Sequence, residues 1–137
     1  MPATTREISL ESKGNTDTID ITDEVAAAVG DAGVAEGAAI VFVPGSTAAV
    51  TTVEYEPGML SDLKTVMERL IPTDGRYAHN HGGDSNGHAH VRAAIVGPSV
   101  SVPVSGGRLV LGTWQQIVLV DFDDRPRSRT VVVQILG

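Results

Sequence analysis

The sequence predicts an α+β fold: a compact single domain with a largely antiparallel sheet and about three short helices. The order of elements is the first reason, because strand-like segments are followed by a helix, more strands, two helices and a final run of strands. The second reason is that no repeat and no linker divides the chain. The third is length, since 137 residues suffice for one hydrophobic core, and we expect a single domain over residues 1–137.

The N-terminal segments predict a hairpin followed by a helix. Residues 5–11 and 16–21 alternate polar and apolar side chains, and a glycine-containing turn lies between them. Thr22 is a candidate N-cap for a helix over residues 23–32, and Gly33 is a candidate stop.

The middle of the chain predicts two strands, two helices and a long loop. Short apolar or Thr- and Val-rich runs indicate the strands, and helical spacing of apolar residues indicates the first of the two helices. Pro57 and Gly58 are expected to break the second strand, and Asn86 is a candidate N-cap for the second helix. The predicted strands cover 38–43 and 48–55, the predicted helices cover 59–71 and 88–96, and the polar, glycine-rich loop between them covers 73–87.

The C-terminal part predicts strands joined by turns. Alternation over residues 100–104 indicates one strand, and residues 108–122 are strand-rich with an irregularity near Gly112. A turn over 123–126 precedes the closing strand over 130–136.

Charge and composition exclude several classes of protein. The net charge is −7, and the only basic cluster is diluted by aspartates, so we expect no nucleic-acid partner. The absence of cysteine excludes thiol catalysis and disulfides. No leader and no membrane-spanning run is recognisable, so we expect a soluble cytoplasmic protein without a membrane partner.

All four histidines lie within twelve residues of the loop and the following helix: His79, His81, His88 and His90. Imidazole is a common metal ligand and the usual acid or base near neutral pH, and Asp84 adds an oxygen donor. The helix start also offers free N–H groups to an anion, and Asn86 precedes it. The alternative is a solvated loop that is rich in histidine, and spacing alone leaves both interpretations open.

Four sequence blocks resemble the YjbQ family, whose members are identified as secondary thiamine-phosphate synthase enzymes. The blocks are Ser46-Thr-Ala-Ala-Val-Thr-Thr-Val-Glu54, His88-Ala-His-Val-Arg-Ala-Ala-Ile-Val-Gly-Pro-Ser99, Gly107-Arg-Leu-Val-Leu-Gly-Thr-Trp-Gln-Gln-Ile117 and Val131-Val-Val-Gln-Ile-Leu-Gly137. The resemblance runs nearly from end to end. It implies a compact α+β domain that assembles as a homotrimer with a cleft near the subunit boundary. The implied reaction joins a pyrimidine pyrophosphate to a thiazole phosphate and releases pyrophosphate.

The resemblance and the residue chemistry together give the candidate roles. A divalent metal is expected among the histidines, with zinc or another transition metal favoured over magnesium because nitrogen donors suit it better. Ser46 and Thr47 either hold a phosphate or cap a turn, and Arg92 is a candidate because it lies beside the histidines. The candidate catalytic residues are Glu54, His79 and His90; the candidate metal ligands are His79, His88 and His90; and the candidate ligand-binding residues are Ser46, Thr47, Asn86, Arg92 and Gln115.

The sequence departs from the family pattern at two places. Gly45 stands where many members have a histidine, and Glu54-Tyr-Glu-Pro-Gly58 replaces the usual acidic stretch, with Glu56 as a candidate substitute for its acidic side chain. His81 matches no family histidine and is expected to be solvated, and Trp114 is expected in the core or in the trimer interface. The leading hypothesis is therefore an enzyme acting on phosphorylated or pyrophosphorylated small molecules. The alternatives are a metal-dependent hydrolase, a non-catalytic trimer that binds a metal or a phosphorylated ligand, and an interaction protein.

Overall fold

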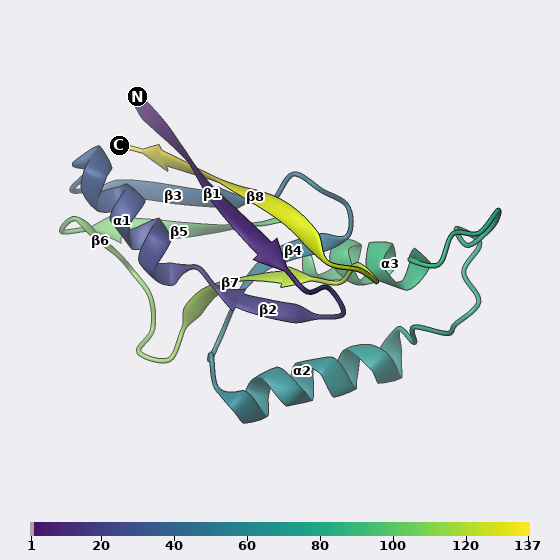
Figure 1. Ribbon diagram of the computed structural model, residues 1–137. Helices are drawn as coiled ribbons and strands as arrows, with labels where there is room; N and C mark the ends of the chain where they lie inside the picture. The colour runs from purple at the N-terminus through teal and green to yellow at the C-terminus, as the bar shows by residue number, and fades with distance from the viewer. Residues whose placement is uncertain (1) are drawn as a thin grey trace.

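The computed structural model describes residues 2–137 and contains two antiparallel sheets and three helices (Figure 1). The larger sheet has the strand order β1-β8-β3-β5-β6, and the smaller has the order β2-β7-β4. The strands are β1 (Ala3–Ser12), β2 (Asp17–Asp20), β3 (Gly37–Phe42), β4 (Ala48–Val53), β5 (Ser99–Ser105), β6 (Arg108–Leu109), β7 (Gln116–Asp121) and β8 (Arg127–Leu136); the helices are α1 (Thr22–Ala32), α2 (Pro57–Leu70) and α3 (Gly87–Val96). The predicted α+β class with antiparallel sheets is confirmed.

The predicted opening hairpin is wrong, because the first two strands belong to different sheets. Strand β1 pairs with β8 along its whole length, and β2 pairs with β7. The connecting residues turn away from a hairpin: Gly14, Asn15 and Thr16 all have positive φ angles, of 74°, 54° and 70°. The N–H groups of Asn15 and Thr16 donate to the carbonyl oxygens of Asp123 and Asp121. The turn therefore packs against the β7–β8 connection and directs the chain into the smaller sheet.

The main core lies between the two sheets. Alternate residues of β7 face opposite sides: Ile117 and Leu119 join the main core, while Val118 and Val120 join a second cluster. The larger sheet contributes residues such as Val133 of β8 to the main core. Helix α1 also contributes to this core. The second cluster includes Ala89 and Ala93 of α3 and is flanked by Leu63 and Met67 of α2. The smaller sheet is thus covered on one side by the larger sheet and on the other by α3 and α2.

The three helices begin close to their predicted positions. Asn86 is the N-cap of α3, as predicted, although its side chain makes no capping hydrogen bond, whereas the N-cap of α1 is Ile21 and not Thr22. Thr22 is the first residue of α1, and its hydroxyl donates to Asp20 and accepts from the N–H of Ile117. Gly33 ends α1 in a left-handed conformation, as expected. Pro57 starts α2 instead of merely breaking the preceding strand, because the Glu56 carboxylate caps the helix by accepting from the N–H groups of Gly58 and Met59.

Helix α2 lies on the outside of the molecule (Figure 1) and has no buried residue. It is attached through the half-buried Leu63 and Met67 and through an ion pair between Glu68 and Arg92 of α3. Among the described residues, no helix is long and apolar enough to cross a membrane.

Candidate functional site

The structure brings two of the four histidines together. His90 lies in the first turns of α3, and His79 lies in the loop that precedes this helix. Their ring centroids are 4.5 Å apart, and the ring planes are tilted by 36°. His79 is exposed and His90 is half-buried, so both rings are accessible to a ligand. Two imidazoles at this separation can present nitrogen atoms to one metal ion or to one phosphate group.

The loop is anchored to the start of α3 in a way that fixes His79. The side-chain oxygen of Asn80 accepts from the N–H of Gly87 at 2.8 Å, and the N–H of Asn80 donates to the carbonyl of Tyr77. The Tyr77 hydroxyl in turn donates to the carbonyl of Pro72 at 2.5 Å. A Cβ atom at Gly87 would lie 2.7 Å from both Asn80 Oδ1 and Tyr77 Cβ. The position therefore needs glycine for the loop to pack closely over α3.

A hollow of about 350 Å³ adjoins the histidine pair. Gly45 and Ser46, which follow β3, line one side, and His90 lines the other side together with small residues of α3. The Ser46 residue is exposed, so its hydroxyl is available to a ligand. A Cβ atom at Gly45 would lie 3.1 Å from Nη1 of Arg129, so a buried guanidinium group lies close to this glycine. The hollow therefore combines an imidazole, a hydroxyl and a nearby cation.

The side chain of His88 does not join the pair. It is 1% exposed, and its Nδ1 atom has no hydrogen-bond partner within residues 2–137. Its nearest recorded ring neighbour is Tyr77, with centroids 6.5 Å apart. Burial lowers the pKa of His88, and the charge of Arg92 lowers it further, so the buried ring is neutral near pH 7.

Arg92 is held by acceptors of the protein itself. Its Nε and Nη2 atoms donate to the carbonyl of Ile71 at 3.0 and 2.7 Å. Nη2 also donates to Glu68 at 3.0 Å, and Nη1 donates to the Thr16 hydroxyl at 3.3 Å. The guanidinium thus ties α3 to the end of α2, and it is not directed at the histidine pair.

Thr47 and Asn86 both donate to the buried carboxylate of Asp123, at 3.1 and 3.3 Å. Burial raises the pKa of Asp123, but hydrogen bonds from Asp124, Asn86 and Thr47 and the charge of Arg127 outweigh burial and lower the pKa to about 2. The carboxylate is therefore ionised, and Thr47 and Asn86 serve as its partners. Of the two predicted residues that follow Gly45, only Ser46 faces the hollow.

A family model described as UPF0047 protein YjbQ-like matches residues 6–137. The chain belongs to the YjbQ-like family. A UPF0047 protein of Archaeoglobus fulgidus is 41% identical over 130 residues, which are 95% of this chain and 99% of that protein. A UPF0047 protein of Mycobacterium tuberculosis is 50% identical over 93 residues, which are 67% of this chain and 70% of that protein.

Solved structures of the family share the fold. A YbjQ-like protein of unknown function from Sulfolobus solfataricus superposes with a TM-score of 0.95 at 34% identity, covering 99% of this chain and 98% of that chain. The family assignment predicted from the sequence blocks is therefore confirmed, together with the fold class.

Within this YjbQ-like chain, Glu54 and Gln115 lie far from the histidine pair. Glu54 follows β4, whereas Ser46 precedes it, and the six extended residues between Ala48 and Glu54 span about 20 Å. The Gln115 amide is engaged locally, since it donates to Thr52 and accepts from the N–H of Gly112. One chain therefore does not combine Glu54 with His79 and His90 in a single site.

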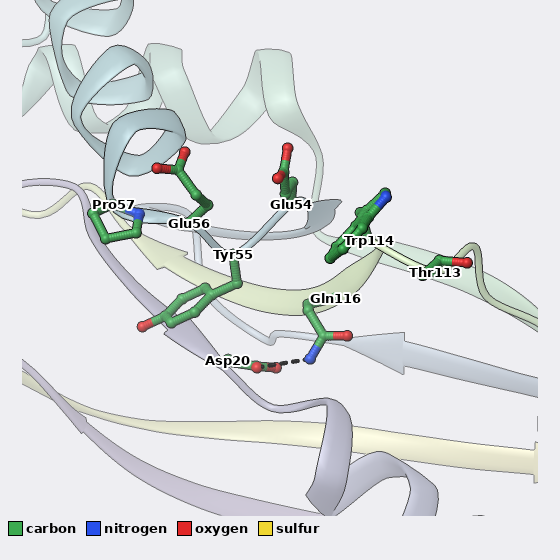
Figure 2. A pocket seen from close by; sticks show the side chains of 8 residues that line it. All are labelled: Asp20, Glu54, Tyr55, Glu56, Pro57, Thr113, Trp114 and Gln116. Carbon is green, nitrogen blue, oxygen red and sulfur yellow. Dashed lines mark hydrogen bonds between the residues drawn. The ribbon is translucent and has the colours of Figure 1, made fainter.

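A second pocket occurs at this end of β4, beside Trp114 (Figure 2). Trp114 is 73% exposed, so the interpretation of this residue as part of the core is wrong. The tryptophan lies within a turn over residues 112–115, closed by the hydrogen bond from the N–H of Gln115 to the carbonyl of Gly112, which leads into β7 where the predicted irregularity falls. Because the indole is exposed in the single chain, its partner would be a subunit interface or a ligand.

The donors present suit a transition metal but form only part of a coordination shell. Within residues 2–137, no three histidine, aspartate or glutamate side chains converge on one point. His79 and His90 supply two imidazoles, whereas a tetrahedral ion takes four ligands. The remaining positions would fall to water, to a ligand or to another chain. His81 is exposed on the same loop and stands apart from the pair.

Two residues near the hollow were not predicted as part of the site, Asn80 and Arg129. Arg129 is 6% exposed and pairs with Asp121 through two hydrogen bonds, from Nε at 2.7 Å and from Nη2 at 2.9 Å. A sequence signal existed for it, since it occupies the same alternating row of β8 as the apolar Val131 and Val133. A charge in such a row indicates a buried ion pair. Asn80 carried no comparable signal.

Proposed function

We propose that this YjbQ-like protein is an enzyme that acts on phosphorylated or pyrophosphorylated small molecules at the His79–His90 pair. The observation that carries the proposal is the close approach of these two rings, 4.5 Å between centroids, at the wall of the hollow lined by Ser46. His79 is held near His90 of α3 by the loop that Asn80 anchors to Gly87. A site of this size accepts a small ligand.

His79 and His90 would hold a divalent transition metal such as zinc, because imidazole nitrogen is a poor ligand for magnesium. A metal ion there supplies positive charge against phosphate oxygens. Histidine rings can also move a proton, since their ordinary pKa lies near neutrality. Ser46 would orient the ligand by hydrogen bonding.

The anionic ligand class is supported by Arg129. Its Nη1 atom has no recorded hydrogen bond within residues 2–137, and it lies behind Gly45. Guanidinium groups favour phosphate oxygens as acceptors. The provisional reaction is the formation of thiamine phosphate from a pyrimidine pyrophosphate and a thiazole phosphate, by resemblance to the family.

A metal-dependent hydrolase is the second candidate. The same two imidazoles would position water in place of an acceptor substrate, and half of a tetrahedral shell is open to it. A non-catalytic trimer that binds a metal or a phosphorylated ligand is the third reading of the same donors.

Metal content is the first test of the proposal. The purified protein, reconstituted with zinc and dialysed, is analysed for bound metal alongside the His79→Ala, His90→Ala and His81→Ala variants. His81 is the matched control, because it lies on the same loop outside the pair. Near-stoichiometric zinc is expected in the wild type and in His81→Ala, and loss is expected in the other two variants. Absence of zinc from the wild type, or equal loss in all three variants, contradicts the metal site.

Turnover is the second test. Release of pyrophosphate and phosphate is followed with a pyrimidine pyrophosphate, with and without a thiazole phosphate, in the wild type and Ser46→Ala. Pyrophosphate release that requires both substrates supports the synthase, and release without the acceptor supports the hydrolase. Binding of the substrates without release of either product identifies a binding protein and ends the enzyme proposal.

A further inference from the structure

The pocket at the far end of β4 has aromatic walls and a negative rim. It measures about 360 Å³, and the residues that give it its chemistry are Trp114, Tyr55, Pro57, Glu54, Glu56 and Asp20. Figure 2 shows Glu54 and Glu56 on one side of the extended segment and the Tyr55 ring on the other, with Trp114 beyond Glu54. No lysine or arginine lines the pocket.

Both aromatic side chains are exposed, and a hydrogen bond holds the tyrosine in place. Trp114 is 73% exposed, and Tyr55 is 43% exposed. The Tyr55 hydroxyl donates to the carbonyl of Thr18 at 3.0 Å, which fixes the ring at the pocket wall. A large exposed indole beside a fixed phenol ring is an uncommon surface, since such groups normally bury their area or cover a partner.

Two of the three carboxylates that line the pocket already accept hydrogen bonds from the protein. The Glu56 carboxylate caps α2, and these hydrogen bonds lower the pKa of Glu56. Asp20 accepts from Thr22 and from the amide of Gln116 at 2.9 Å; burial raises the pKa of Asp20, but these hydrogen bonds outweigh burial. Both groups therefore remain ionised at neutral pH.

Glu54 is the carboxylate left for a ligand. Its side chain is exposed and makes no hydrogen bond or ion pair with any residue of 2–137, although its backbone carbonyl accepts from the N–H of Glu56. Glu54 and Trp114 line this pocket together, and both also line the adjoining hollow on the side of Gln115. A ligand resting on the indole would thus meet the free carboxylate.

We propose that this pocket binds a small organic cation, a quaternary ammonium or protonated amine, on the face of Trp114 with Glu54 as its counter-ion. The quadrupole of an indole face attracts a cation more strongly than any other side-chain ring does. Opposite charge at the rim adds to this attraction, and the volume suits a ligand of small size. A phosphate or carboxylate ligand is disfavoured by the three carboxylates.

The cation pocket is separate from the histidine site. The two lie at opposite ends of β4, about 20 Å apart along the strand. The proposal therefore does not rest on the proposed function, and either can fail without the other. Glu54 gains a role here as a binding residue.

Tryptophan fluorescence reads this site directly, because Trp114 is the only tryptophan of the chain. The wild-type protein is titrated with choline and with 3,3-dimethylbutan-1-ol, its neutral isostere, at constant ionic strength. Choline is expected to change the emission saturably and to bind at least about tenfold more tightly than the neutral isostere. The isostere carries no charge, so it has neither the cation–π attraction to Trp114 nor the attraction to the Glu54 carboxylate. Equal affinity for the two compounds overturns the proposal.

Three variants complete the test. Glu54→Gln keeps shape and removes charge, so choline binding is expected to weaken by about five- to tenfold, whereas Glu24→Gln, an exposed carboxylate on α1, leaves it unchanged. Trp114→Leu, followed by calorimetry, is expected to abolish binding; because the indole is exposed, this variant keeps its fold. Choline binding that persists in Trp114→Leu overturns the proposal. An emission that no cation changes and that iodide cannot quench also overturns it, since a second copy of the chain would then cover Trp114.

Discussion

Single side chains in this protein divide sharply between those that serve the fold and those that remain free. His79 and Ser46 are exposed beside a hollow. In contrast, the side chains of Thr47, Asn86 and Arg92 donate hydrogen bonds within the protein. Ser46 and Thr47 are adjacent in the sequence but belong to different groups. Their separation depends on which way each side chain faces.

His88 provides a residue-scale prediction. Its buried Nδ1 lacks a partner, so His88→Leu removes an unpaired polar atom while keeping much of the volume. The free energy of unfolding by urea is expected to stay the same or to rise by up to about 1 kcal/mol. Zinc content is expected to be unchanged. A variant that loses zinc would instead restore His88 to the metal ligands suggested by the family resemblance.

The choice of His79 and His90 as candidate ligands followed from the family resemblance. The structure places their ring centroids 4.5 Å apart, and their role as ligands stays a prediction. The role of Arg129 was not foreseen, although its row in β8 is otherwise apolar. The distance between Glu54 and the histidines was not foreseen either. A residue count gives a distance in space only when the segment is known to be one extended strand.

At the scale of elements, the loop before α3 depends on one glycine. Gly87→Ala would place a Cβ atom 2.7 Å from Asn80 Oδ1 and from Tyr77 Cβ, so the loop must shift and carry His79 away from His90. Zinc affinity is expected to fall on the order of tenfold, as for other residues that support metal ligands. Calorimetric titration with zinc measures this fall.

The control for Gly87→Ala is Gly30→Ala on α1. Nothing lies within 4 Å of a Cβ atom there, and its φ angle is not positive, so zinc binding should not change. Stability should rise slightly, because alanine favours a helix. Equal loss of zinc affinity in both variants would show that the loop is not the cause.

Helix α2 is predicted to detach in acid. Hydrogen bonds from the Thr73 hydroxyl and N–H and from Arg92 lower the pKa of Glu68 from 4.5 to about 2. Since the folded-state pKa is depressed, this stabilisation is complete above about pH 4.5 and is lost as the pH falls toward 2. The protection of the α2 amides, measured as the observed exchange rate relative to the intrinsic rate at each pH, is therefore expected to fall through this range. In Glu68→Gln, α2 should already exchange faster at pH 7, whereas Glu24→Gln should behave as the wild type.

The elements themselves were largely predictable, and their partners were not. All three helices and most strands appear near their predicted positions, because caps, breakers and periodicity are local signals. The first hairpin failed because Gly14, Asn15 and Thr16 adopt positive φ angles together, which a turn-forming composition does not reveal. Strand pairing between β1 and β8 joins residues more than a hundred positions apart.

At the scale of the whole molecule, several large apolar side chains remain in solvent. Trp114, Ile95 and Leu70 are 73%, 68% and 69% exposed in the single chain. The protein is expected to form a homotrimer, and light scattering should give three times the mass of one chain, independent of concentration in the micromolar range. A mass of one chain would contradict this assembly.

The trimer and the cation pocket are compatible only if the interface leaves the Trp114 face open. Ile95 of α3 and Leu70 of α2 supply apolar surface away from that pocket. Ile95→Lys is expected to shift the measured mass toward that of one chain, whereas the exposed Val110→Lys on the loop after β6 serves as the comparison. A trimer that survives Ile95→Lys would place the contact elsewhere.

The pairing of β8 with both β1 and β3 also limits how far the larger sheet can fold during synthesis. Of the described strands, β8 leaves the ribosome last, and until it does the larger sheet has no connection between β1 and the rest. During synthesis, β1 and β3 therefore each have an unpaired edge. Unpaired strand edges favour association with other chains. Chaperone dependence should consequently be greatest for nascent chains that stop short of residue 127, and it should fall once β8 has emerged.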